Sequence, residues 1–222
     1  MYQPAHRQFE ADDPAALLAE LVTSVPATLV TLGGDGLRAT ILPLLFDPAD
    51  GPFGSLRGHV ARGNPQWRDL APDVEALAIL DGPEAYVTPS WYEEKRQTGK
   101  VVPTWNYVTV QAHGPLTVHH EPAWLVDHVR HLVDRHEAGR PDPWSVDDAP
   151  IDYIEGQARA IVGIELRISR LEAKRKLSQN RRVADVLGVI AGLAEGTDRE
   201  REVARAMQDD PILRRETGRE AR

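Results

Sequence analysis

The sequence predicts a mainly β fold with inserted and appended α-helices, and three observations lead to this prediction. Short segments rich in β-branched residues recur between residues 27 and 171. Turn residues separate them, most clearly the run GGDG at 33–36. Helical apolar spacing appears only before, between and after these segments. So many short strands satisfy their backbone groups only if a sheet closes into a barrel or two sheets pack together.

The first expected elements are a helix and a β-hairpin. The helix is predicted over residues 14–25, because Pro14 suits a first helical position and Asp12 and Asp13 precede it. Pro26 ends it. The hairpin follows, with one strand on each side of the glycine-rich turn, at 27–32 and 37–46.

More strands and helices complete the predicted order. Strands are expected at 55–61, 74–80, 85–89, 106–114 and 115–120, helices at 122–137 and 151–160, and a long alternating strand at 161–171. A last helix is expected at 183–193. We interpret residues 1–195 as one domain, and residues 196–222 as a charged, weakly ordered tail with only a thin apolar stripe.

Composition and charge narrow the function classes. Hydrophobic residues make up 41% and charged residues 27%, as in globular proteins, and there is no cysteine for disulfides, thiolate ligands or nucleophiles. The net charge is −8, but residues 165–222 carry 14 Lys and Arg against 11 Asp and Glu. DNA is therefore a possible partner that charge does not support. No signal peptide or membrane span is recognised, which predicts a cytoplasmic protein.

Common catalytic motifs are missing from the sequence: it has no P-loop, HExxH, GxSxG or dinucleotide fingerprint. His128 and His131 have the i, i+3 spacing that some metal sites use, but no second pair supports them. We interpret them as a solvated helix flank and predict no metal site.

Four segments combine polar donors with tryptophans in a way that a plain barrel does not require. They are HVARGNPQW (59–67), TPSWY (88–92), VPTWNY (102–107) and KLSQNR (176–181). Their candidate ligand residues are Arg62, Asn64, Trp67, Ser90, Trp91, Thr104, Trp105, Asn106, Lys176, Ser178, Gln179 and Asn180.

A phosphorylated aromatic ligand such as FMN suits this set. Arg62 and Lys176 supply positive charge, hydroxyl and amide groups supply hydrogen bonds, and tryptophan supplies a flat wall. The structural alternatives stay open: each tryptophan can be core, and Ser178–Asn180 can cap the helix that follows. A helix N-terminus is itself an anion site, so both interpretations can hold.

The chain resembles the PaiB-like family of FMN-binding negative transcriptional regulators. The resemblance rests on MYQPAHRQFEADDP (1–14), LRGHVARGNPQWRDL (56–70), YVTPSWY (86–92), GKVVPTWNYVTVQAHG (99–114), DRHE (134–137) and IVGIELRISRLEAKRKLSQNR (161–181). It extends to about residue 195. One departure is Arg175, which stands where the family has an aromatic residue between two lysines.

The resemblance implies an FMN-binding split β-barrel, related to pyridoxamine phosphate oxidase-like proteins, that forms a homodimer with flavin sites at the subunit interface. It implies that the strand with Gly58, His59, Val60 and Ala61 runs beside the isoalloxazine ring. Arg62 and Asn64 are then expected near the ribityl phosphate, with Trp67 packed behind the strand. The segments VPTWN and KLSQN are expected to close the pocket.

Three functions remain open. The family name implies a transcriptional regulator, and a flavin-dependent oxidoreductase using NAD(P)H is the alternative. Catalytic residues stay unassigned, although His59, Tyr92 and Tyr107 are candidate proton donors. Haem binding or degradation is a lesser alternative, because some split barrels handle haem. For FMN binding, the sequence predicts that Arg62→Ala, and more weakly Lys176→Ala, lowers affinity and leaves the dimer intact.

Overall fold

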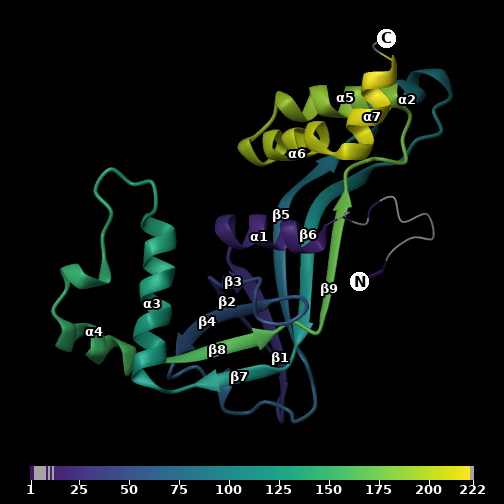
Figure 1. Ribbon diagram of the computed structural model, residues 1–222. Helices are drawn as coiled ribbons and strands as arrows, with labels where there is room; N and C mark the ends of the chain where they lie inside the picture. Colours follow the sequence, from purple (N-terminus) through teal and green to yellow (C-terminus); the bar gives the residue numbers. More distant parts are fainter. Residues whose placement is uncertain (3–8, 10, 12, 221–222) are drawn as a thin grey trace. The chain divides into compact units, whose positions relative to one another are not determined.

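The computed structural model describes residues 1–2, 9, 11 and 13–220 (Figure 1). Much of the N-terminal run that carries the family resemblance, and Asp12, lies outside the described residues. By its contacts the chain divides into two compact units. Unit 1 comprises residues 1–12, 81–109 and 173–222, and unit 2 comprises residues 13–80 and 110–172.

The strands form two sheets. A four-stranded sheet in unit 2 has the order β3-β4-β8-β7, from Leu45–Asp47, Ser55–Ala61, Ile161–Arg167 and Leu116–His119. A five-stranded sheet has the order β2-β1-β5-β6-β9, from Gly36–Leu42, Ala27–Gly33, Ala76–Val87, Thr104–Gly114 and Arg170–Lys176. Strands β5, β6 and β9 contribute residues to both units.

The expected first helix and hairpin are confirmed. Helix α1 (Pro14–Ser24) starts where the Asp13 side chain accepts a hydrogen bond from the Ala16 amide at 2.9 Å. Strands β1 and β2 pair in antiparallel register from Ala27↔Leu42 to Gly33↔Gly36. Gly36 has a φ of +105°, a conformation that side chains other than glycine rarely adopt, so this turn position needs glycine.

Four expected strands differ from the structure. The strand at 37–46 is interrupted at Pro43, which has no N–H for a sheet ladder, and continues in the other sheet as β3. The strands at 74–80 and 85–89 are one strand, β5, because sheet pairing overrides the local turn signal of residues 81–84. The strand at 161–171 is divided between β8 and β9, since the Ile168 and Ser169 amides donate to Gly54 and His113 instead of continuing one ladder.

Helices cover or extend the sheets within each unit. In unit 2, α3 (Pro122–Glu137) and α4 (Ile151–Ala158) contact each other and strand β8, and both match expected helices. A short 3-10 helix (Val146–Asp148) lies between them in the chain. In unit 1, α2 (Glu93–Gln97) and the 3-10 turn Pro89–Trp91 contact α5 (Val183–Ala194).

The charged C-terminal segment differs from the weakly ordered tail that was expected. It forms helices α6 (Asp198–Asp209) and α7 (Pro211–Glu220), which lie beside α5 (Figure 1). Val203, Met207 and Leu213, which belong to the thin apolar stripe, are buried. A capping box between Thr197 and Glu200 starts α6. A division into domains near residue 195 stays a prediction.

Candidate functional site

The predicted ligand residues fall into two groups, one in each unit. Unit 2 contains Gly58, His59, Val60, Ala61, Arg62, Asn64 and Trp67. Unit 1 contains Ser90, Trp91, Thr104, Trp105, Asn106, Lys176, Ser178, Gln179 and Asn180. The role of both groups in holding a cofactor stays a prediction.

Strand β4 presents its residues alternately to the interior and to helix α3. Gly58 and Val60 are buried, and a Cβ on Gly58 would lie 2.6 Å from a Leu44 methyl carbon. His59 points the other way and reaches His128 of α3, while Ala61 is exposed at the strand end. Gly58 is therefore required for core packing, whatever else the strand contacts.

The Arg62 guanidinium is bound to backbone carbonyl groups. Its Nε donates to the Arg159 carbonyl at 2.6 Å and its Nη2 donates to the Ile161 carbonyl at 2.8 Å. The Arg62 amide also donates to the Ala160 carbonyl at 2.8 Å. These bonds hold the turn between α4 and β8. Two of the guanidinium nitrogens that were expected to bind a phosphate therefore bind the protein itself.

The rest of the NPQW run forms a short 3-10 helix, Pro65–Trp67. The Asn64 carboxamide oxygen accepts from the Gln66 amide at 2.9 Å, and its nitrogen donates to the Thr40 hydroxyl at 2.9 Å. Buried Gln66 donates to the Leu29 carbonyl at 3.1 Å. The Trp67 indole donates back to the Arg62 carbonyl at 3.2 Å. The run is thus tied to strands β1 and β2.

Sequence reasoning missed a histidine pair in unit 2. His128 is only 3% exposed, not part of a solvated helix flank as predicted, because α3 packs on the sheet and carries it inward. Its Nε2 lies 3.1 Å from His59 Nδ1. Burial lowers the pKa of His59 and lowers the pKa of His128 to about 4, so both rings are neutral near pH 7.

An aromatic stack supports this pair. The Trp124 ring stacks on His119 with centroids 4.2 Å apart and on His128 with centroids 5.3 Å apart. Gly163 makes room for it, since a Cβ there would lie 2.2 Å from the indole ring. The i, i+4 spacing of Trp124 and His128 was the available sequence signal, but nothing in the sequence places His59 opposite them.

In unit 1, the tryptophan of the PSWY run packs against helix α5. A Cβ on Gly192 would lie 2.3 Å from the Trp91 ring, and one on Gly188 would lie 2.2 Å from the Trp91 carbonyl oxygen. Lys95 donates to the Ser90 hydroxyl at 3.1 Å. Trp91 is therefore one of the predicted residues with a clear structural role.

Three polar residues of unit 1 are buried and hydrogen-bonded within the protein. The Ser178 hydroxyl donates to the Asn106 carboxamide oxygen at 3.1 Å, and Asn106 in turn donates to Met207 Sδ at 3.4 Å. Gln179 donates to the Arg175 carbonyl at 2.7 Å and to Asp210 Oδ2 at 3.1 Å. These contacts connect the LSQ run to the helices that follow, while Asn180 is exposed in the next turn.

Lys176 has different partners from these buried polar residues. Its ammonium donates to the Thr104 hydroxyl at 2.5 Å and also to the Trp105 carbonyl, and it lies 5.6 Å from the Tyr107 ring centroid. Burial, followed by the positive charges of Lys174 and Arg181, lowers its pKa. Neighbouring Trp105 is 53% exposed and meets Tyr86 edge to face, with centroids 6.1 Å apart.

Thr104, Trp105 and Lys176 together fit the two ends of a phosphorylated flat ligand. The positive charges of Lys174, Lys176 and Arg181 repel one another. An anion beside them is favoured, because it offsets this repulsion and the cost of burying the Lys176 ammonium. The exposed indole offers a face for a ring. Within unit 1 these residues are therefore the ones that would hold such a cofactor.

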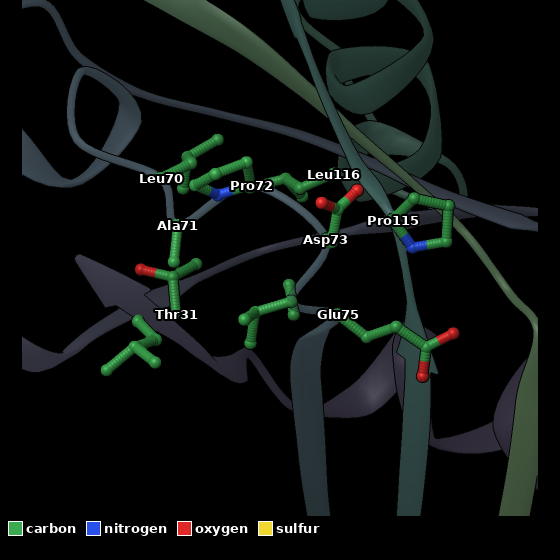
Figure 2. Close-up of a pocket in the computed structure, with 11 residues that line it drawn as sticks. Thr31, Leu70, Ala71, Pro72, Asp73, Glu75, Pro115 and Leu116 are labelled. Carbon is green, nitrogen blue, oxygen red and sulfur yellow. The ribbon is translucent and has the colours of Figure 1, made fainter.

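A different concave region lies in unit 2. It is a pocket of about 440 Å³. Figure 2 shows residues that line it, among them Thr31, Leu70, Ala71, Pro72, Asp73, Glu75, Pro115 and Leu116. None of the predicted ligand residues lines it. Its two carboxylates and apolar walls do not supply the cationic donors that a phosphate needs.

Comparison with known proteins identifies the family. The family described as "Putative FMN-binding domain" matches residues 1–170. Protease synthase and sporulation protein PAI 2 of Bacillus subtilis is 33% identical, with 82% of this chain and 85% of that protein covered. An uncharacterized protein of Aspergillus fumigatus, AFUA_5G13800, is 35% identical, with 88% of each chain covered.

Solved structures share the fold at low sequence identity. The flavocytochrome Anf3 from Azotobacter vinelandii has a TM-score of 0.55 at 13% identity, over 78% of this chain and 72% of that one. The conserved hypothetical protein Rv2991 from Mycobacterium tuberculosis has a TM-score of 0.53 at 16% identity, over 79% and 91%. The chain therefore belongs to the PaiB-like family of FMN-binding proteins, has a split β-barrel fold with added helices, and has FMN as its cofactor.

Proposed function

We propose that this chain is an FMN-binding regulatory protein that works as a homodimer in the cytoplasm. The observation that carries the proposal is the cluster of Thr104, Trp105 and Lys176, where a half-buried ammonium beside two other cations favours an anion. The cofactor supplies redox chemistry when bound. Lys176 and Thr104 hold its phosphate, and the exposed Trp105 face packs against its ring.

The regulatory part of the proposal rests on the Bacillus relative. That protein's name connects it with protease synthesis and sporulation. Residues 1–164 of the present chain carry 12 Lys and Arg against 23 Asp and Glu, which disfavours a broad DNA-binding surface there. We therefore propose that the regulatory output passes through a protein or small-molecule partner and not through direct DNA contact.

A flavin-dependent oxidoreductase is the second candidate, and the His59–His128 pair favours it. A neutral imidazole hydrogen-bonded to a second imidazole can accept or hand on a proton. Of the other candidate proton donors, Tyr92 is only 1% exposed and lies beneath the Arg181 guanidinium, whereas Tyr107 is half-buried under the Lys176 ammonium. His59 is thus the better candidate.

An absorbance spectrum of the purified full chain tests the cofactor. Oxidised flavin bands, retained through gel filtration and extractable as FMN, are expected. A strong Soret band would instead support the haem alternative, to which the flavocytochrome likeness gives only a shared fold. A protein that takes up neither cofactor on titration contradicts the proposed function.

Two assays separate regulator from enzyme. Electrophoretic mobility shift at physiological salt is expected to show no specific DNA complex, and NAD(P)H oxidation by the FMN-loaded protein is expected to stay near the rate of free FMN. Rapid turnover of NAD(P)H supports the oxidoreductase. A specific, salt-resistant DNA complex overturns the proposal of an indirect output.

The homodimer is supported by an apolar face of the β1–β2 hairpin. Leu37 and Ile41 on the edge strand β2 are 76% and 71% exposed, and Leu32 opposite Leu37 is 36% exposed. Side chains of this size are seldom left in a row facing water. We propose that a second copy of the chain covers them, and that flavin sites lie at the subunit interface.

Light scattering tests this interface directly. The double variant Leu37→Glu/Ile41→Glu is expected to be monomeric, because charges in an apolar interface cannot be desolvated. Ile151→Glu is the matched control, since Ile151 is 62% exposed on α4 and is expected to leave the dimer intact. A double variant that stays dimeric excludes this face.

A further inference from the structure

Helix α3 and strands β3 and β4 of unit 2 border a second pocket, of about 480 Å³. Phe46 and Trp124 give it two aromatic walls, and Leu45 and Pro48 add apolar surface. This volume lies within the range that small-molecule sites occupy. The pocket contains none of the unit 1 residues proposed to hold FMN, so it needs its own explanation.

A buried, neutral histidine lines this pocket. His128 is bonded through Nε2 to His59, and its Nδ1 has no hydrogen-bond partner in the described part of the chain. A buried ring nitrogen without a partner is unfavourable, and a polar ligand group removes that cost. Because the imidazole is neutral, it can pair with a ligand group without adding charge.

Each charged residue of the lining except one has a polar partner close to it. Arg57 donates to Glu165 at 2.8 Å and lies 3.6 Å from Asp47. Asp127 lies 3.3 Å from His131 on the next helical turn. Arg135, one turn further along α3, has no ion pair with any residue that the structure describes.

We propose that this pocket binds a small aromatic carboxylate. The aromatic ring packs against Phe46 and Trp124, the carboxylate pairs with Arg135, and a polar ring substituent reaches His128. A guanidinium matches a carboxylate with two parallel hydrogen bonds, which gives both affinity and selectivity. The pocket is thus a site for a small acid, lined by unit 2 residues, through which an effector acts on this protein.

Calorimetric titration of the full chain with benzoate tests the proposal. It is done on FMN-saturated and FMN-free protein, so that a failure of cofactor binding is seen separately. Benzoate is expected to bind saturably to both forms. Benzamide, which has the ring without the charge, and acetate, which has the charge without the ring, are each expected to bind at least about tenfold more weakly.

Two variants locate the binding. Arg135→Gln is expected to lower benzoate affinity by about tenfold and to leave benzamide binding unchanged, because only the charge-assisted pair is lost. Arg140→Gln, which removes an exposed arginine paired with Glu137, is the control and is expected to change neither. Folding of both variants is checked by their thermal unfolding.

Several results would overturn this inference. They are no saturable binding of benzoate at millimolar concentration, equal binding of acetate, or unchanged benzoate affinity in Arg135→Gln. Loss of benzoate binding when FMN is added would also overturn it, since benzoate would then occupy the cofactor site.

Discussion

Both units contain buried or half-buried basic side chains, but the partners of these side chains differ. In unit 2, burial lowers the pKa of His59 and of His128, and one hydrogen bond joins the two rings. In unit 1, Lys174 and Lys176 lie against aromatic faces and donate to carbonyl oxygens, and burial lowers the pKa of Lys176. An imidazole loses its proton at little cost near neutral pH, whereas an ammonium must find partners.

The difference between the histidines of unit 2 and the lysines of unit 1 indicates which of them favours an anionic ligand. A neutral histidine pair leaves no charge to balance, so unit 2 offers a proton site and a polar contact. The lysines of unit 1 repel each other and have no carboxylate among their described partners. The anionic end of FMN is therefore expected at Lys176 and not at Arg62, whose guanidinium is bound to carbonyl groups.

Acid pH gives the largest expected effect. The folded-state pKa of His128 is about 4, below its ordinary value of 6.5, so the unfolded chain binds a proton first. The contribution of His128 to the free energy of unfolding is therefore fully present above pH 6.5 and is lost as the pH falls towards 4. At about 1.4 kcal/mol per pKa unit, His128 contributes a loss of about 2–3 kcal/mol between pH 7 and pH 4.5.

Urea unfolding at both pH values measures this loss. Carboxylates with lowered pKa also lose stability in acid, so the decisive quantity is the difference between variants. His128→Gln is expected to show a smaller loss than wild type, while His136→Gln, at an exposed site on the same helix, behaves as wild type. Equal losses in all three proteins would mean that folding does not lower the pKa of His128.

Arg62→Ala is expected to lower the free energy of unfolding by about 2 kcal/mol. The variant leaves the carbonyls of Arg159 and Ile161 without their charged donor. FMN affinity of the folded variant is expected to stay within about twofold, which revises the expectation from sequence. Arg159→Ala, which keeps the backbone carbonyl, is the control. A tenfold loss of FMN affinity would instead indicate that Arg62 binds the phosphate.

Lys176→Gln is expected to weaken FMN binding by about tenfold, because one charge-assisted contact with the phosphate is lost. Its free energy of unfolding is expected to change by less than about 1 kcal/mol, since removing a buried charge offsets the lost hydrogen bonds. Fluorescence titration with FMN and with riboflavin measures the effect. Only FMN affinity should fall; an equal loss for riboflavin would place Lys176 away from the phosphate. Lys100→Gln at an exposed site is the control.

Ser178→Gly gives the smallest expected effect. Ser178 has a φ of +68°, which glycine adopts more easily, but glycine loses the hydrogen bond to Asn106. The two changes are each about 1 kcal/mol and of opposite sign, so the free energy of unfolding should barely change. Ser178→Ala, which loses the bond and keeps the strain, should be about 1 kcal/mol less stable than the glycine variant. FMN affinity should be unchanged in both.

Local signals explain how much of the fold could be predicted. Helices α1, α3, α4 and α5 and strands β1, β4 and β6 lie close to their predicted ranges, because each has a clear period, a cap or a proline at its start. The prediction was wrong where the chain moves from one sheet to the other, at Pro43 and at Ile168–Ser169. Which sheet a strand joins depends on distant partners that a local pattern does not contain.

The sequence by itself determined the family, the cofactor and most helices and strands, because their signals lie in short runs of neighbouring residues. Only the tertiary structure decided the use of each polar side chain. Arg62 and Gln179 are bonded to the protein itself, Lys176 remains half-buried beside other cations, and His128 is paired with His59. A side chain's hydrogen bonds depend on groups that folding brings from far along the chain, and no motif records them.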